Sequence, residues 1–102
     1  MKLKEILTLI NNFVWSDAIF IKGSFNVWDL DTICAVLDPD DVENEEDEEP
    51  KYAIENGLKY ALSIQEVKGI IDNAFQQKDD CSEGDLLNAF LFYFRNDAFI
   101  EF

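Results

Sequence analysis

The sequence contains no histidine. Histidine is the commonest general base, the usual metal ligand and the standard partner of a serine or cysteine nucleophile, so its absence removes the usual routes to catalysis. Glycine is scarce as well, with four residues, and their positions form neither a phosphate-cradling loop nor a dinucleotide-binding fingerprint. We therefore expect a protein that is not an enzyme and that uses no cofactor and no metal.

Cysteines and basic residues are also few. Cys34 and Cys81 are the two cysteines, and without a CxxC motif they predict neither a zinc site nor a thioredoxin-type motif. We expect Cys34 to be buried and both residues to be free thiols in the cytoplasm. The chain has eight basic and 22 acidic residues. Nucleic acids and anionic membranes are therefore poor partners, because neutralising their phosphates requires Lys and Arg.

Long apolar runs are absent, which excludes a membrane-spanning helix of roughly 20 apolar residues. The first twelve residues contain two lysines, as a signal peptide would, but polar residues interrupt the apolar ones and no small-residue cleavage site follows. The chain has 102 residues and is 48% hydrophobic, which suffices for one core of ordinary size. We expect a single cytoplasmic domain over residues 1–102.

What the sequence does contain is a dense acidic run. Nine of the twelve residues at 38–49 are acidic, and they supply nine of the fourteen excess negative charges of the chain. Such a run is often only a solubility feature. Here it is internal and flanked by apolar sequence, so folded structure on both sides would hold it in place. We expect a loop over residues 38–50 that attracts a basic protein through Asp38, Asp40, Asp41, Glu43, Glu45, Glu46, Asp47, Glu48 and Glu49.

Hydrophobic periodicity predicts the secondary structure. The expected helices are residues 2–13, a short turn at 52–57, 63–77 with a Ser63–Glu66 capping box, and 82–96 with a Ser82–Asp85 cap. The expected strands are 18–21, 32–37, 58–62 and 98–102. The strand at 32–37 is apolar on both faces, which favours a central position in the sheet. The order predicts an α+β domain with a short, mainly antiparallel sheet and about three helices packed on it.

The segment Trp28-Asp29-Leu30-Asp31-Thr32 is the strongest lookalike of a catalytic motif. Paired aspartates beside a strand could hold Mg²⁺, but the aspartyl phosphatase pattern D-x-D-x-T requires threonine at position 33, which is Ile33. The structural alternative is a turn before the second strand. A calcium loop of the EF-hand type needs a glycine, and no glycine lies between positions 24 and 56. A metal-dependent enzyme is therefore a disfavoured reading.

The aromatic residues have two interpretations. Phe90, Phe92, Tyr93 and Phe94 are more typical of a core than of an interface. Loops that carry tryptophan often anchor interfaces, so we add Phe25, Trp28, Asp29 and Asp31 to the predicted partner-binding residues. Exposed Phe or Trp could equally mediate self-association, which leaves a homodimer open.

Four stretches together resemble a small bacterial family. They are residues 28–32, the strand end Val36-Leu37-Asp38-Pro39-Asp40-Asp41, the acidic run to Pro50, and Gly57-Leu58-Lys59-Tyr60-Ala61-Leu62-Ser63-Ile64-Gln65. This pattern, over most of the chain, is similar to immunity proteins of contact-dependent growth inhibition systems (CdiI-like). The resemblance implies a cytoplasmic, non-enzymatic protein that binds and blocks one cognate toxin domain, often a nuclease, and it supplies no functional residues position by position.

An acidic chain could instead be a DNA mimic of the anti-restriction kind that binds several host nucleic-acid enzymes. Such a mimic should spread its charge along a face about as long as a duplex segment. Here the charge is concentrated in one loop. This favours the other hypothesis, an inhibitor that binds a basic toxin domain through its acidic loop.

Overall fold

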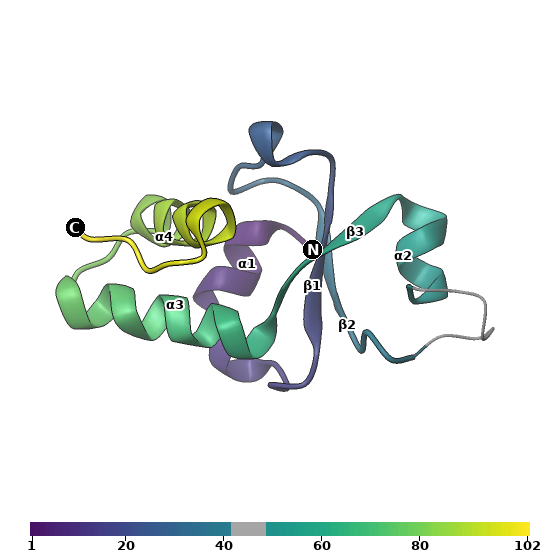
Figure 1. Cartoon of the computed structure of the whole chain (residues 1–102), viewed down its shortest axis with the longest axis horizontal. Helices are drawn as coiled ribbons and strands as arrows, with labels where there is room; N and C mark the ends of the chain where they lie inside the picture. The colour runs from purple at the N-terminus through teal and green to yellow at the C-terminus, as the bar shows by residue number, and fades with distance from the viewer. Residues whose placement is uncertain (42–48) are drawn as a thin grey trace.

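A computed structural model of the chain describes residues 1–41 and 49–102. The molecule is elongated, with extents of 44 × 25 × 23 Å. Figure 1 shows a small sheet across the middle of the molecule with helices on both sides of it. The expected α+β class is confirmed. Within the described part of the chain, no helix is long and apolar enough to cross a membrane.

The sheet has three antiparallel strands, β1 (Ala18–Lys22), β2 (Cys34–Leu37) and β3 (Leu58–Ser63), in the order β2-β1-β3. The prediction that the strand at 32–37 is central was wrong, since β1 is central and β2 is an edge strand. Both faces of β2 are nevertheless covered, because Cys34 and Val36 contact the main core while Ala35 and Leu37 contact a second, smaller one. Two cores, rather than two neighbouring strands, explain its apolar sequence.

The main core lies between the sheet and three helices, α1 (Leu3–Thr8), α3 (Ile64–Gln77) and α4 (Glu83–Asn96). A 3-10 helix, Ile10–Asn12, extends α1. A register shift between β1 and β3 leaves Ala61 and Leu62 both buried although they are consecutive. The shift has the character of a β-bulge, which places one extra residue opposite its partner strand.

The short helix α2 (Lys51–Asn56) covers the opposite face of the sheet. Its Ala53 joins the second core, which consists of Ala18, Phe20, Ala53 and Leu58. Gly57 ends α2 with φ of +68°, a conformation that favours glycine. This agrees with the helical turn expected at residues 52–57.

Both predicted caps are present. Ser63 and Glu66 form a capping box at the start of α3, and Ser82 and Asp85 form one at the start of α4. Each box satisfies backbone N–H groups that the first helical turn leaves without a partner.

The strand expected at residues 98–102 was wrong, because the structure has no strand there. Asp97 adopts a left-handed conformation with φ of 53°, and the chain turns back along α3 and α4. Gln77 holds the last part of this segment, since its Nε2 donates to the Ile100 carbonyl at 2.7 Å and its Oε1 accepts from the Phe102 N–H at 3.1 Å. The apolar residues that suggested a strand instead cover the helices, as Phe99 does against Tyr93.

Candidate binding surface

The acidic run begins in a tight turn at the end of edge strand β2. The Asp41 N–H donates to the Asp38 carbonyl at 3.2 Å, and the Asp40 N–H donates to the Asp38 carboxylate at 2.9 Å. Pro39 supplies the φ that the second position of such a turn requires. The turn that the sequence predicts is therefore present, and it exposes Asp38, Asp40 and Asp41 to solvent.

The described chain resumes at Glu49, next to α2. Glu49 forms an ion pair with Lys59 of β3 at 4.0 Å, and Glu55 forms one with Lys51 at 3.9 Å. Between the turn and α2 lies an open hollow of about 390 Å³. We call it the acidic hollow, and its lining residues are Leu37, Asp38, Asp41, Pro50, Lys51, Tyr52 and Glu55.

Four of the predicted acidic residues, Asp38, Asp40, Asp41 and Glu49, thus lie near α2, because the turn of Asp38 and Asp41 shares a hollow with α2 and Glu49 comes just before that helix. Glu43, Glu45, Glu46, Asp47 and Glu48 lie outside the described residues, so their part in binding remains a prediction from sequence.

A second hollow adjoins the first. It has a volume of about 350 Å³ and runs along β2, and we call it the edge groove. Its lining is mostly apolar and consists of Met1, Phe13, Asp17, Cys34, Ala35, Val36, Leu37 and Tyr52. Leu37 and Tyr52 line both hollows. The sequence analysis did not predict Phe13 and Tyr52 as residues of this surface, because they come from distant segments. The one sequence signal for such a role was a tyrosine on the polar side of a short helix.

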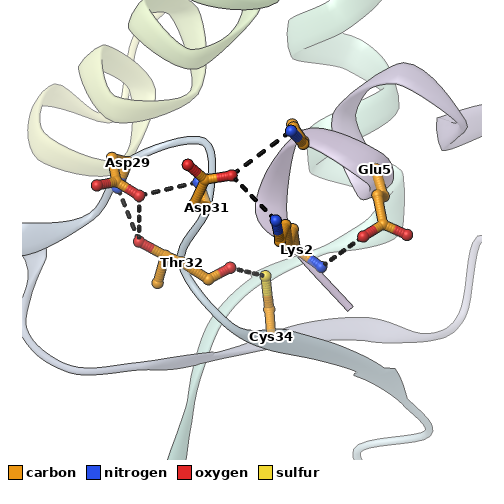
Figure 2. Close-up of polar contacts among 7 residues, drawn as sticks. Lys2, Glu5, Asp29, Asp31, Thr32 and Cys34 are labelled. Carbon is orange, nitrogen blue, oxygen red and sulfur yellow. Dashed lines mark hydrogen bonds and ion pairs between the residues drawn. The ribbon is translucent and has the colours of Figure 1, made fainter.

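Asp29 and Asp31 are engaged within the fold (Figure 2). The Asp29 carboxylate accepts from the Asp31 N–H at 2.9 Å and from the Thr32 hydroxyl at 3.3 Å. Asp31 lies 3.4 Å from the Lys2 ammonium and 3.5 Å from that of Lys4. These two charges, Lys2 first, lower the pKa of the Asp31 carboxyl.

This arrangement stabilises the turn before β2 and links it to the N-terminal segment. It agrees with the structural interpretation of the motif, which was a turn before the second strand. Both carboxylates stay exposed to solvent, and their part in partner binding remains a prediction from sequence. Among the described residues, no group of three or more His, Cys, Asp or Glu side chains could hold a metal ion.

Phe25 and Trp28 lie beside α4 rather than beside the acidic hollow. Only 8% of Trp28 is exposed, and its Nε1 donates to the Gly23 carbonyl at 3.0 Å. Its ring contacts Phe94 edge-on at 4.7 Å, and Phe25 stacks on the same Phe94 at 5.4 Å. A partner could reach little of the Trp28 ring, so the expectation of an exposed anchor is replaced by a core role for Trp28. Phe25 is half-buried in the same cluster.

The aromatic run of α4 divides between core and surface. Phe90 is completely buried, as expected for a core residue, whereas Phe92 and Phe94 keep 38% and 37% of their surface exposed. A helix exposes one side to solvent wherever a single layer covers it, so the prediction of a core role holds for Phe90 and only in part for its neighbours.

Neither cysteine thiol is activated as a nucleophile. Burial raises the pKa of Cys34 to about 12, and burial also raises the pKa of Cys81. Both cysteines are unpaired, and Cys34 is buried as expected. A thiol that stays protonated at neutral pH is a weak nucleophile.

Acidic residues also gather at the opposite end of the molecule, around the connection between α3 and α4 (Figure 1). They are Asp72, Asp79, Asp80, Glu83 and Asp85, and we call them the far acidic group. Lys78 forms an ion pair with Asp85 there at 2.9 Å. Negative charge is therefore not confined to the acidic run.

Comparison with known families gives one match, which covers residues 1–102 and carries the description "domain of unknown function (DUF7716)". No curated protein and no solved structure matches the chain.

Proposed function

This chain belongs to the DUF7716 family, and from its surface we propose that it is an immunity protein that binds and neutralises a cognate basic toxin domain. The toxin domain is a nuclease, and the pair acts in the bacterial cytoplasm as in contact-dependent growth inhibition. The observation that supports this proposal is the acidic hollow, where Asp38 and Asp41 at the start of the acidic run line one open space together with Glu55 of α2, which pairs with Lys51.

The physical basis of inhibition is charge complementarity. A nuclease cleft uses Lys and Arg to hold phosphates, and closely spaced exposed carboxylates present the same sign of charge to it. Complementary charge accelerates encounter and disfavours wrong partners. The chain has no histidine and neither cysteine lines the acidic hollow, so the hollow lacks the commonest pairing of nucleophile and base, which supports binding rather than catalysis as its role.

The test is protection of a cell. The proposal expects a large secreted protein to be encoded beside this gene, and the C-terminal domain of that protein is expressed in bacteria with and without the chain. We expect growth arrest without the chain and normal growth with it, and we expect the purified chain to stop cleavage of plasmid DNA or tRNA by that domain. Growth arrest that persists at equal expression, together with no complex on gel filtration, would refute the proposal.

One observation favours a second candidate, a DNA mimic. The far acidic group and the acidic hollow lie at opposite ends of a molecule 44 Å long, which is the length of about 13 base pairs at 3.4 Å each. A DNA mimic should inhibit several unrelated DNA-binding enzymes, such as a panel of restriction endonucleases. An immunity protein should leave that panel active and block the cognate domain alone.

A further inference from the structure

The edge groove lies along the outer edge of the sheet rather than over one of its faces. Its lining includes Cys34 and Val36, which face the main core, and also Ala35 and Leu37, which face the second core. Phe13 adds to it from the segment after the 3-10 helix, and Tyr52 adds to it from α2 on the opposite side of the sheet. A space bordered by both faces of an edge strand has the shape that an additional strand would fill.

Hydrogen bonding along β2 leaves one position open. Residues Ala35 and Leu37 stand opposite Phe20 and Ala18 of β1, and the alternation of an antiparallel ladder then directs the backbone groups of Cys34 and Val36 outward. Cys34 follows this rule, because its N–H donates to the Met1 carbonyl at 2.8 Å and its carbonyl accepts from the Met1 nitrogen at 3.0 Å.

Val36 is the next outward position. Within the described residues, neither its N–H nor its carbonyl has a backbone hydrogen-bond partner on the outer side of the sheet. An open edge that is ready to pair is a recognised docking mode for extended peptides, in which the backbone supplies affinity and side-chain pockets supply specificity.

The charges around this edge select the occupant. Carboxylates outnumber cations here, because Asp17 lies at the edge groove with the Met1 ammonium, and three carboxylates line the adjoining acidic hollow with one lysine. They are Asp38, Asp41 and Glu55, with Lys51. A second copy of this chain would bring the same carboxylates together and be repelled, and a nucleic acid would be repelled for the same reason. A basic segment would be attracted, and an arginine or lysine could donate to the carboxylates.

We propose that the β2 edge binds an extended, basic segment of the toxin domain as a short added strand. The segment pairs with the backbone of Val36, lays an apolar side chain in the edge groove and directs a lysine or arginine into the acidic hollow. Tyr52, which is 55% exposed and borders both hollows, packs against it. The identity of the partner rests on the proposed function, whereas the binding mode rests on this geometry.

The first experiment uses a peptide probe and the full chain labelled with ¹⁵N. The probe is a nine-residue peptide in which lysine alternates with valine, and the control peptide alternates glutamate with valine. We expect the basic peptide to shift the Val36 amide resonance and to slow its hydrogen exchange, with no effect from the acidic peptide. A basic peptide that binds without affecting Val36, or that does not bind, would overturn the proposal.

Matched variants locate the site. Tyr52→Ala should weaken peptide binding by about tenfold, as for a contact residue of ordinary importance. Ile54→Ala is the control, because Ile54 is 51% exposed on the same helix but lines neither hollow. Asp41→Asn with Glu55→Gln should weaken binding more than Asp79→Asn with Asp80→Asn, which changes the net charge equally at the far end. Equal effects within either pair would contradict the assignment.

Val36→Pro tests the backbone pairing directly. It removes the outward N–H while leaving the ladder to β1 intact, a substitution that edge strands tolerate. We expect binding about fivefold weaker, the effect of one hydrogen bond. If this variant does not fold, the Tyr52→Ala comparison and the Val36 exchange measurement still decide the question.

The same variants separate this proposal from the proposed function. If the chain neutralises the neighbouring toxin domain but Tyr52→Ala neutralises equally well and Val36 exchanges freely in the complex, the edge is not the binding site and the immunity function stands. If the peptide protects Val36 but no toxin domain is neutralised, the edge is a docking site and the immunity function fails.

Discussion

Trp15 and Trp28 are the two tryptophans of the chain, and the structure gives them opposite environments. Trp15 is 64% exposed in the connection before β1, whereas Trp28 is 8% exposed and donates a hydrogen bond to the Gly23 carbonyl. The sequence could not separate them, because each stands in a short polar connection. Burial of Trp28 depends on Phe90 and Phe94, which meet it only after α4 has folded back.

These environments predict different costs of truncation. Trp28→Ala should lower the free energy of unfolding by about 3–5 kcal/mol, the usual cost of removing a large buried aromatic side chain. Trp15→Ala is the control and should change it by less than about 0.5 kcal/mol, as exposed substitutions do. Chemical denaturation of the three proteins measures both. Equal stability of the two variants would contradict the core role of Trp28.

Asp31 predicts a pH dependence of stability. Lys2 and Lys4 lower its pKa in the folded state below the ordinary value of 3.8, so the folded state favours the ionised form. The stabilisation is therefore present above the unfolded pKa and is lost as the pH falls through the folded pKa. Thermal melts between pH 6 and about pH 2.5 should show a smaller loss of stability on acidification for Asp31→Asn than for the unchanged chain.

The control for this experiment is Asp72→Asn, an exposed carboxylate without an ion pair to any residue that the structure describes. Its melts should follow those of the unchanged chain. If Asp31→Asn also does so at every pH, the ion pairs with Lys2 and Lys4 contribute nothing to stability, which is the outcome for many exposed pairs.

At the scale of elements, periodicity located most helices and strands but failed for residues 98–102, and it did not predict how the elements are arranged. Capping boxes are local, so Ser63 and Ser82 could be identified from four residues each. The position of β2 in the sheet depends on which strands it meets, and its two apolar faces have the same sequence whether strands or a second small core cover them. The segment at 98–102 has a strand-like composition, but its partner is Gln77 of α3 rather than a strand.

Gln77 predicts how that segment is held. Gln77→Ala removes both hydrogen bonds to Ile100 and Phe102, so the amides of residues 98–102 should exchange with solvent faster. The melting temperature should change little, because those bonds are exposed and the core residues of α3 remain in place. Gln76→Ala is the control, since Gln76 is an exposed neighbour on the same helix without such a bond. Hydrogen exchange measured for both variants decides; unchanged exchange in Gln77→Ala would mean that Phe99 alone holds the segment.

At the scale of the whole molecule, the negative charge of the protein was predictable from the sequence, whereas the candidate binding surface was predictable only in part. Net charge and the acidic run follow from composition, and the Asp38–Asp41 turn follows from turn chemistry. The edge groove does not, because it requires Phe13, β2 and Tyr52 to meet from three separate segments. The far acidic group was also overlooked, because its residues are spread over α3, its connection to α4 and the first turn of α4, and no dense run marks them.

Electrostatic steering provides the last prediction, which compares two chains of equal net charge. Converting Glu45, Glu46, Asp47 and Glu48 to Gln or Asn changes the formal charge from −14 to −10. The control converts Asp72, Asp79, Asp80 and Glu83 of the far acidic group and gives the same −10. If the acidic run faces the toxin during approach, the first variant should associate more slowly than the control, with a shallower dependence on salt, because charges beyond a screening length of about 8 Å at physiological ionic strength contribute little. Stopped-flow association with the neighbouring toxin domain across a salt series measures both rates. Equal slowing of the two variants would show that total charge rather than its position governs encounter, which is the behaviour of a DNA mimic whose whole length is negative.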